Sequence, residues 1–392
     1  MKMLTIHFIL LLLTAPLQVE PLWTAAIGDT GHDTGYSSVA VGKDRLLITG
    51  NANEKSTVFC LSLDGQELWT YDNGPVWTEQ FPGTRGTPLI DPESQYGYDQ
   101  SPLGELVCLD LESGQPLWRC SLAEEYDTPP PLYGWSGSLL MEGEVLYVLL
   151  GREKASILCL NRITGTEILA CESTGNASGY GTPILFEFAG LPLMAAMDAK
   201  GVFAVNRKTG KLMFHQDHRA RLDENITSPI FHVDRLFVTN AVSDSKQLKL
   251  ILTGPDKIET EIVWTNRLLA NSHGGVTLHN GRLYGSTSKS GTGFACISWE
   301  DGANVFHDTE NVVRGSFAVD TDNATFYILT EFGEVIICHP EETGFSVQKR
   351  WQLPGGEIGN TYAHPTLHGN RLYIRISGIL YCFEVAQSAS CK

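Results

Sequence analysis

The chain has 392 residues, of which 42% are hydrophobic and only 19% are charged, a composition that argues against both a disordered chain and a coiled coil. Its 28 basic and 45 acidic residues give a formal net charge of −17 at pH 7. Such a chain repels phosphate backbones, so we expect no nucleic-acid partner. The length is too great for one ordinary two-layer domain, which suggests two or three domains unless a repeat accounts for it.

Residues 1–20 predict an export signal. Lys2 gives a positive start, residues 4–13 are almost wholly apolar, and Thr14-Ala15-Pro16 ends the run. This run is too short to cross a bilayer core of ~30 Å as a helix, but it suits a secretory signal. The alternative is a buried strand or helix. No Cys lies between residues 13 and 50, and no later run is long enough to span a membrane. We therefore expect residues 21–386 to form an exported domain, periplasmic or secreted, that is neither a lipoprotein nor membrane-spanning, with a tail at 387–392.

One phrase recurs along the rest of the chain. It consists of an apolar strand, a polar turn containing Gly, and a second strand ending in a large residue. FCLSLDGQELWTY and VCLDLESGQPLWRC show it, with Gly65 before Trp69 and Gly114 before Trp118. The large residues follow one another at intervals of 42–51 positions: Trp23, Trp69, Trp118, Leu169, Phe214, Trp264, Phe306 and Trp351. A strand-rich repeat of this length is typical of a β-propeller with one four-stranded sheet per repeat.

The two ends of the repeat array complement each other. The last copy starts at Tyr362, has three strands and lacks its aromatic residue, whereas residues 20–24 form a lone fourth strand that carries Trp23. Pairing these segments would close a ring and remove open edges. The prediction is an all-β, eight-bladed β-propeller of four-stranded blades, closed by the N-terminal strand. Chance recurrence within a β-sandwich is the alternative, which eight in-phase copies disfavour.

Most of the nine cysteines occupy equivalent places in the repeat. One slot holds Cys60, Cys108, Cys159, Cys296, Cys338 and Cys382, and in another copy it holds Ala204. A slot that accepts Cys or Ala indicates a small buried position. Cys120 and Cys171 share a second slot. Disulfides are disfavoured, because equivalent slots in successive repeats lie too far apart to bridge.

The repeated phrase, with Ser-Pro or Thr-Pro hairpins before it, resembles the pyrroloquinoline-quinone (PQQ) repeat. The resemblance to exported PQQ-like β-propeller proteins covers essentially the whole chain after the signal. It implies eight blades in which the terminal Trp of one blade docks on its neighbour. The residues that match this role are Trp23, Trp69, Trp118, Trp264 and Trp351.

The resembling family has two functional branches. One comprises quinoprotein dehydrogenases, which oxidise alcohols or sugars with bound PQQ and Ca²⁺. The other is non-enzymatic and resembles the propeller of the outer-membrane protein assembly machinery. The chain has no adjacent Cys-Cys pair and no compact acidic cluster with calcium spacing, which departs from the first branch. It also lacks the lipid-anchor Cys typical of the second. We expect no cofactor, with PQQ and Ca²⁺ as the alternative.

Aligning the hairpins on the Ser-Pro or Thr-Pro slot predicts which residues line the mouth of the central channel. They are Tyr36, Arg85, Trp135, Tyr180, Ile226, His273, Arg314 and Tyr362. All but Ile226 are candidate ligand-binding residues. Arg314, Tyr362, Tyr36 and Arg85 come from consecutive blades and form a basic, aromatic arc suited to carboxylates and planar rings. The alternatives are a plugged channel, a protein or peptide surface, or a cofactor site. A catalytic role for His273 would need a nucleophile such as the Ser of a G-x-S-x-G motif. The sequence has no such motif, so we assign no catalytic residue.

Two longer connections, 72–77 and 124–131, carry Trp77 and Tyr126 and suggest either exposed recognition loops or rim packing. The leading hypothesis is an exported, non-catalytic scaffold that binds a protein, a peptide or a small anionic ligand. We expect it to be a monomer. A PQQ-dependent oxidoreductase of the alcohol or sugar dehydrogenase type is the alternative function, and glycan binding is a third.

Overall fold

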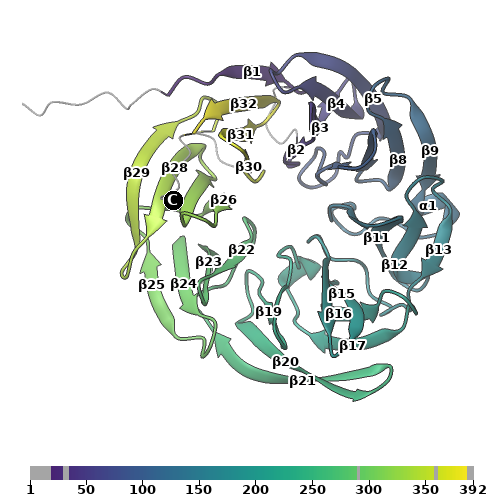
Figure 1. Cartoon of the computed structure of the whole chain (residues 1–392), viewed down its shortest axis with the longest axis vertical. Coiled ribbons are helices and arrows are strands. Elements are labelled where there is room, and N and C mark those ends of the chain that lie inside the picture. The colour runs from purple at the N-terminus through teal and green to yellow at the C-terminus, as the bar shows by residue number, and fades with distance from the viewer. Residues whose placement is uncertain (1–18, 30–34, 289–291, 357–360, 386–392) are drawn as a thin grey trace, which may run out of the picture.

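The computed structural model describes residues 19–29, 35–288, 292–356 and 361–385, so nearly all of the predicted signal and the tail lie outside the described residues. The described residues form eight four-stranded antiparallel sheets arranged in a ring (Figure 1). The prediction of an eight-bladed, all-β propeller is confirmed. Among the described residues, no helix is long and apolar enough to cross a membrane.

In blades 1–4 the strands follow chain order from the channel outwards. Blade 1 contains β2 (Ala40–Val41), β3 (Arg45–Ala52), β4 (Lys55–Ser62) and β5 (Glu67–Pro75). Blade 2 contains β6 (Leu89–Ile90), β7 (Tyr96–Gln100), β8 (Glu105–Asp110) and β9 (Pro116–Ser121). Blade 3 contains β10 (Leu140–Glu142), β11 (Val145–Gly151), β12 (Ala155–Asn161) and β13 (Glu167–Ala170). Blade 4 contains β14 (Ile184–Phe188), β15 (Leu191–Met197), β16 (Gly201–Asn206) and β17 (Leu212–Asp217).

Blades 5–7 follow the same order, and blade 8 takes its outermost strand from the N-terminus. Blade 5 contains β18 (Ile230–His232), β19 (Arg235–Val238), β20 (Ser245–Gly254) and β21 (Lys257–Asn266). Blade 6 contains β22 (Val276–His279), β23 (Arg282–Thr287), β24 (Gly293–Ser298) and β25 (Asn304–Asp308). Blade 7 contains β26 (Gly315–Asp320), β27 (Thr325–Thr330), β28 (Glu334–Pro340) and β29 (Phe345–Gln352). Blade 8 contains β30 (Thr366–His368), β31 (Arg371–Ile376), β32 (Ile379–Glu384) and β1 (Trp23–Ala26). Two short helices lie in connections: α1 (Leu122–Glu125) and the 3₁₀ helix η1 (Arg221–Asp223).

The ring is closed by the pairing of β1 with β32, as predicted. Trp23 lies opposite Cys382, and Ala26 lies opposite Ile379. The backbone N–H of Leu22 also donates to the Cys382 carbonyl at 2.8 Å. The two ends of the described chain therefore share one sheet.

The core lies between the faces of adjacent sheets. One cluster joins Tyr98 and Leu106 of blade 2 to Leu146 and Leu158 of blade 3. All eight described cysteines are buried and free, and Ala204 is fully buried as well. This confirms that the Cys/Ala slot is a small buried position.

At the outer rim, a Trp of one blade packs on the turn glycine of the next. The indole N–H of Trp69 donates to the Leu111 carbonyl at 2.9 Å, and a Cβ on Gly114 would lie 2.6 Å from the Trp69 ring. Gly114 has φ +71°, which only glycine adopts readily. The same contact joins Trp23 to Gly65, Trp118 to Gly165 and Trp264 to Gly302. The docking role implied by the resemblance is thus found at four joints.

At the inner end of the blades, hydroxyl groups join one blade to the next. The backbone N–H of His364 donates to Ser38 Oγ at 2.9 Å, and that of Ser38 donates to Thr87 Oγ1 at 3.0 Å. The N–H of Thr87 donates in turn to Ser138 Oγ at 3.2 Å. The Ser or Thr of the repeat therefore fixes the inner strands of blades 8, 1, 2 and 3 beside one another.

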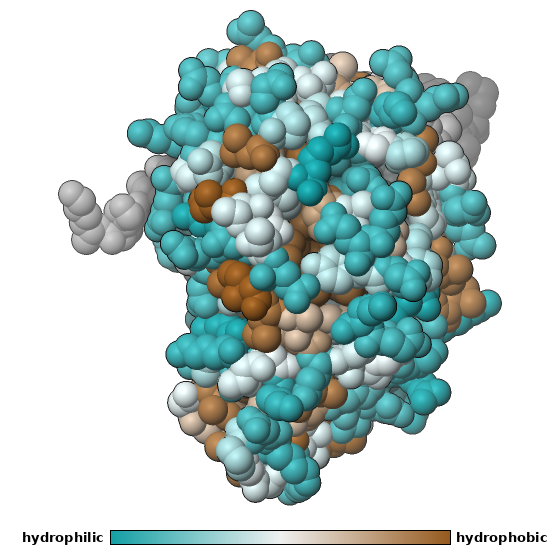
Figure 2. All heavy atoms as spheres, turned by 90° about the vertical axis from the view of Figure 1, so that its right-hand side faces the viewer, coloured by the Kyte–Doolittle hydropathy of each residue, from teal (hydrophilic) through white to brown (hydrophobic). Residues whose placement is uncertain are grey.

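The side of the ring that carries blades 2 and 3 is largely hydrophilic, with apolar residues in small groups (Figure 2). Leu117 on β9 and Ile168 on β13 are among the exposed apolar residues of the outermost strands. Isolated exposed apolar residues are ordinary on a protein surface.

Gly165→Ala should destabilise the protein more than Gly143→Ala. Both glycines have positive φ, so each substitution strains the backbone by about 1–2 kcal/mol. An Ala Cβ at Gly165 would also lie 2.6 Å from the Trp118 ring, whereas a Cβ at Gly143 would meet no described atom within 4 Å beyond its chain neighbours. Overpacking should add about 1–3 kcal/mol at Gly165. Denaturant unfolding of both variants measures the difference, and equal losses would contradict the docking contact.

Candidate ligand-binding site at the channel mouth

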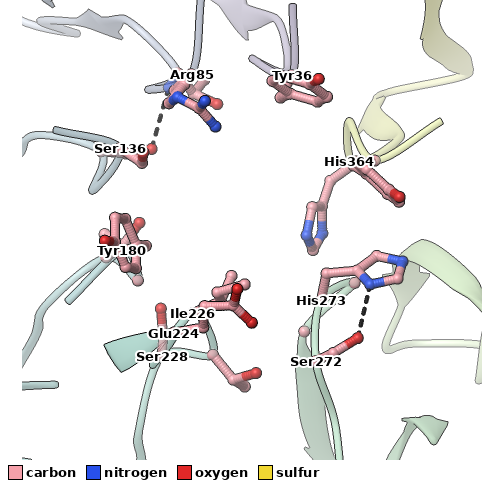
Figure 3. Close-up of a pocket in the computed structure, with 18 of the residues that line it drawn as sticks. Tyr36, Arg85, Ser136, Tyr180, Glu224, Ile226, Ser228, Ser272, His273 and His364 are labelled. Atoms are coloured by element: carbon pink, nitrogen blue, oxygen red, sulfur yellow. Dashed lines mark hydrogen bonds between the residues drawn. The ribbon is translucent and has the colours of Figure 1, made fainter. Parts of the chain in front are cut away.

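A pocket of about 660 Å³ opens where the inner strands of the ring begin. The side chains that surround it come from blades on opposite sides of the ring, and several point into the common space (Figure 3). Its lining includes Tyr36, Phe81, Arg85, Tyr133, Ser136, Tyr180, Glu224, Ile226, Ser272, His273, Tyr362 and His364. Six of the eight residues that the hairpin alignment predicted are among these: Tyr36, Arg85, Tyr180, Ile226, His273 and Tyr362.

Trp135 does not line the pocket. Only 2% of it is exposed, it packs in the core between blades 2 and 3, and its indole N–H donates to the Leu150 carbonyl at 3.3 Å. The alignment was one residue out, because Ser136-Gly137-Ser138 is the true equivalent of Arg85-Gly86-Thr87. Ser136 lines the pocket in its place.

Arg314 also lies away from the pocket lining and is neutralised. Its Nη2 donates to Oε2 of Glu331 at 2.8 Å, and Oε1 of that carboxylate lies 2.9 Å from Nε2 of His273. Burial alone would raise the pKa of Glu331, but His273 and Arg314 outweigh it and hold the pKa below its usual value. Ser272 Oγ lies 2.9 Å from Nδ1 of His273. This network holds the His273 ring in place, and it leaves the Arg314 guanidinium paired with Glu331.

An aromatic wall stands on the side of the pocket formed by blades 8, 1 and 2. The rings of Tyr36 and Tyr362 are stacked, with centroids 5.8 Å apart and planes at 25°. The guanidinium carbon of Arg85 lies 5.4 Å from the Tyr36 ring centroid, and His273 meets Tyr362 edge-on at 4.7 Å. A planar group could lie against these rings beside a cation.

Arg85 has no carboxylate partner among the described residues. Its Nη2 donates to the backbone carbonyls of Gln80 and Phe81. Burial lowers the pKa of Arg85, yet a guanidinium remains charged at neutral pH. The pocket of this acidic protein therefore contains a guanidinium that has no ion-pair partner among the described residues and can accept an anion.

A second cation, Arg375, lies nearby in β31 and was not predicted. Only 2% of it is exposed, and burial lowers its pKa to about 9. Its donors reach Ser37 and the carbonyls of Thr49 and Ser377, and its Nη2 has no partner among the described residues. Arg375 Nη2 lies against Gly35, the residue before Tyr36, and Arg85 lies over the Tyr36 ring, so both cations are on the same side of the mouth.

The opposite side carries a tyrosine pair that the sequence did not predict. The Tyr133 hydroxyl donates to Glu224 Oε1 at 2.7 Å, and its ring lies 5.7 Å from that of Tyr180. Burial, followed by Glu224, raises the pKa of Tyr133 to about 12, so its phenol stays protonated. The Phe81 ring packs edge-on against Tyr133 at 5.8 Å and is 46% exposed.

Of the two alternatives left open for the connection 72–77, packing at the rim is the one that Trp77 follows, because only 6% of it is accessible. Its indole N–H donates to the Gln80 carbonyl at 3.2 Å, and its ring lies 5.9 Å from the Arg85 guanidinium. Trp77 supports the connection, and Phe81 is the residue this connection exposes.

Buried amides hold the loop that carries Glu224. Asn225 is fully buried, and its Nδ2 donates to the carbonyls of Asp198 and His218 at 2.8 and 3.1 Å. Asn240 donates to Asn225 Oδ1 at 3.1 Å. His218 is 1% exposed, and neither ring nitrogen has a partner among the described residues.

The fold and the repeat define this chain as a PQQ-like β-propeller. The model of the family described as outer membrane protein assembly factor BamB matches residues 18–168 and 54–308, and the chain belongs to this family. No curated protein sequence matches the chain.

Solved structures show the same fold at low sequence identity. BamB from Moraxella catarrhalis is 14% identical, with 94% of this chain and 100% of that chain covered and a TM-score of 0.66. Quinohemoprotein alcohol dehydrogenase from Comamonas testosteroni is 12% identical, with 95% and 77% covered and a TM-score of 0.63. The C-terminal WD40 domain of Sif2 is 10% identical, with 95% and 100% covered and a TM-score of 0.59.

Stability should fall in mild acid because of His218. Burial lowers its pKa from 6.5 to about 4, so it folds in the neutral form. A depressed folded-state pKa gives stability that is present above pH 6.5 and is lost as the pH falls towards 4. We expect a loss of about 2 kcal/mol by about pH 5. His218→Gln should show a shallower fall in unfolding free energy between about pH 7 and about pH 5. Parallel pH profiles for the two proteins would contradict this assignment.

Proposed function

We propose that this chain is an exported, non-catalytic binding propeller whose channel mouth takes a partner segment with an anionic group beside an apolar or aromatic one. The observation that carries the proposal is the Arg85 guanidinium, which faces an aromatic pocket without a carboxylate partner among the described residues.

The electrostatics support an anionic group. A carboxylate meeting a half-buried guanidinium makes a charge-assisted, bidentate pair. Arg375 adds to the field, whereas Arg314 is neutralised by Glu331 and does not. On a chain of net charge −17, this local reversal of sign would also select against wrong orientations of the ligand.

The rim supports a protein or peptide partner. Phe81 and Ile226 line the pocket and are 46% and 37% exposed. Leu132 and Leu222 are each 56% exposed in the connections that also carry Tyr133 and Glu224. Exposed apolar residues around a tyrosine-lined hollow are typical of binding surfaces with a few strong anchors. The matching family is described as an outer membrane protein assembly factor, which agrees with a protein partner.

A PQQ-dependent oxidoreductase is the second candidate, favoured by the Arg85 guanidinium beside the stacked Tyr36 and Tyr362 rings. These groups fit a planar polycarboxylate. The accompanying Ca²⁺ generally takes about six to eight oxygen ligands. Glu224 is the single carboxylate among the described lining residues, and it already accepts the Tyr133 hydrogen bond. The donors present therefore do not fit the metal, and we derive no redox step.

Selection from a random peptide library on the immobilised protein tests the proposal. Enriched peptides should carry an acidic group next to an aromatic or aliphatic residue. Their affinity should fall about 10- to 100-fold in Arg85→Gln, because a hydrogen bond to a charged group contributes about 1.5–3 kcal/mol.

Arg119→Gln is the matched control, since it removes the same charge from the exposed outer strand β9. Enrichment of peptides without acidic groups, or an equal loss in Arg119→Gln, would contradict the proposal. Stoichiometric uptake of PQQ with Ca²⁺, followed by absorbance, would favour the second candidate instead.

A further inference from the structure

The channel contains a second space, the inner hollow, directly beside the pocket at its mouth. Its volume is about 490 Å³, within the range of roughly 300–1,000 Å³ that is usual for ligand pockets. Its lining comes from the innermost strands of three consecutive blades, β14, β18 and β22, and from the proline before β18. Pro229, Ile230 and Val276 line both spaces, so the inner hollow adjoins the pocket.

The inner hollow is apolar. Eight of its nine described lining residues are apolar, and Thr277 is the exception. Ile230, Phe231 and Val276 are each only half-buried by the described chain, so apolar surface is left uncovered inside the ring. A well-ordered water makes about three hydrogen bonds, and the lining side chains offer it few partners. Replacing poorly ordered water by an apolar group of a ligand therefore favours binding.

Aromatic packing fixes one wall of the inner hollow. The rings of Phe186 and Phe231 have centroids 4.1 Å apart with their planes at 30°, and Phe188 meets Phe231 edge-on at 6.4 Å. Ile230 packs from the same strand against the core cluster that contains Phe237. Because these side chains are held by their neighbours, the hollow is formed before a ligand enters, and binding has to order few groups.

Polar side chains separate the inner hollow from the cations. Arg85 and Tyr36 face the common space from one side of the mouth, and Ser228 and Ser272 lie across it (Figure 3). Ser228 directly precedes Pro229 of the hollow. An alkyl chain that crossed from Arg85 to the hollow would remove water from these hydroxyls without replacing its hydrogen bonds. A peptide backbone can both donate to hydroxyls and accept from them, so the arrangement favours a peptide.

We propose that the partner segment inserts one large apolar side chain into the inner hollow while its acidic group pairs with Arg85. This inference rests on the proposed function and names the part of the site that selects the partner. The backbone of the segment lies across the hydroxyls of the mouth. The size of the apolar side chain determines affinity, because it determines how much apolar surface is covered in the hollow.

A peptide series bound to the full chain tests the proposal. The probe is the acidic peptide most enriched in the library selection, with its apolar residue replaced in turn by Ala, Val, Leu or Phe. Affinity should rise about fourfold for each methylene that enters the hollow, since burying one contributes ~0.8 kcal/mol. The Leu peptide should therefore bind about 10- to 100-fold more tightly than the Ala peptide.

Ile230→Asn should remove most of this difference, and Leu89→Asn is the matched control. Both residues begin an innermost strand after a proline, and both are half-buried against a core cluster. They also hold the same register, with Tyr98 opposite Leu89 and Phe237 opposite Ile230. Ile230 lines the hollow, whereas Leu89 is absent from the described lining of both spaces. The series on the unsubstituted chain does not depend on whether either variant folds.

The outcomes separate this inference from the proposed function. Equal affinity for the Ala and Leu peptides, with binding still weakened in Arg85→Gln, would overturn the inference and leave the proposed function in place. An equal loss of the difference in Leu89→Asn would also overturn it. Octanoate that binds as tightly as the Leu peptide would contradict the assignment of a peptide. Binding that is insensitive to both Arg85→Gln and the apolar residue would contradict the proposed function itself.

Discussion

The structure depends on the docking of a large side chain from one blade onto the glycine turn of the next. Each four-stranded sheet buries its faces only against its neighbours, so no blade is complete alone. The Trp contact fixes how each blade sits on the next. The indole N–H donates to a carbonyl in the next blade, and the ring fits only where the turn lacks a Cβ. The last of these joints is made by Trp23, whose strand β1 belongs to blade 8 and whose ring lies on Gly65 of blade 1.

A second series of joints at the inner ends of the blades determines what the mouth can bind. The hydroxyls of Ser38, Thr87 and Ser138 accept backbone N–H groups from adjacent blades. The residue two positions before each of these hydroxyl residues lines the pocket: Tyr36, Arg85 and Ser136. The repeat thereby fixes the positions around the mouth, and the residue type at each one gives the site its chemistry. The cation side has Arg85 and Arg375, and the other has the Tyr133–Glu224 pair.

The sequence was sufficient for the architecture, because the fold repeats one pattern in phase and each copy confirms the others. The closing strand could be predicted because both the missing strand and the lone one are visible. The site was predictable where the Ser-Pro or Thr-Pro slot is clear, as at Tyr180 and Arg85. The prediction failed at Trp135. In that hairpin Leu139 stands where others have proline, and the Gly137-Ser138 pair gives the correct alignment.

Other features depend on contacts between distant segments, which a repeat alignment does not reveal. Arg314 matched its slot, but Glu331, from the end of a neighbouring strand, neutralises it. Tyr133 and Glu224 are 91 positions apart and meet through loops outside the repeat. Arg375 lies in the strand RLYIRI, which is otherwise apolar at its centre. A cation at this place in the strand is the sequence feature that could have indicated a buried charge.

Hydrogen exchange of Trp23→Ala, compared with Trp118→Ala, tests the central claim most directly. The two residues make the same contact, but Trp23 alone among the docking tryptophans closes the ring between the two ends of the described chain. Ring closure through Trp23 predicts that its loss releases amide protection in β30–β32 and β2–β5 together, while Trp118→Ala affects blades 2 and 3. Unchanged protection in blades 8 and 1 of Trp23→Ala would contradict the account.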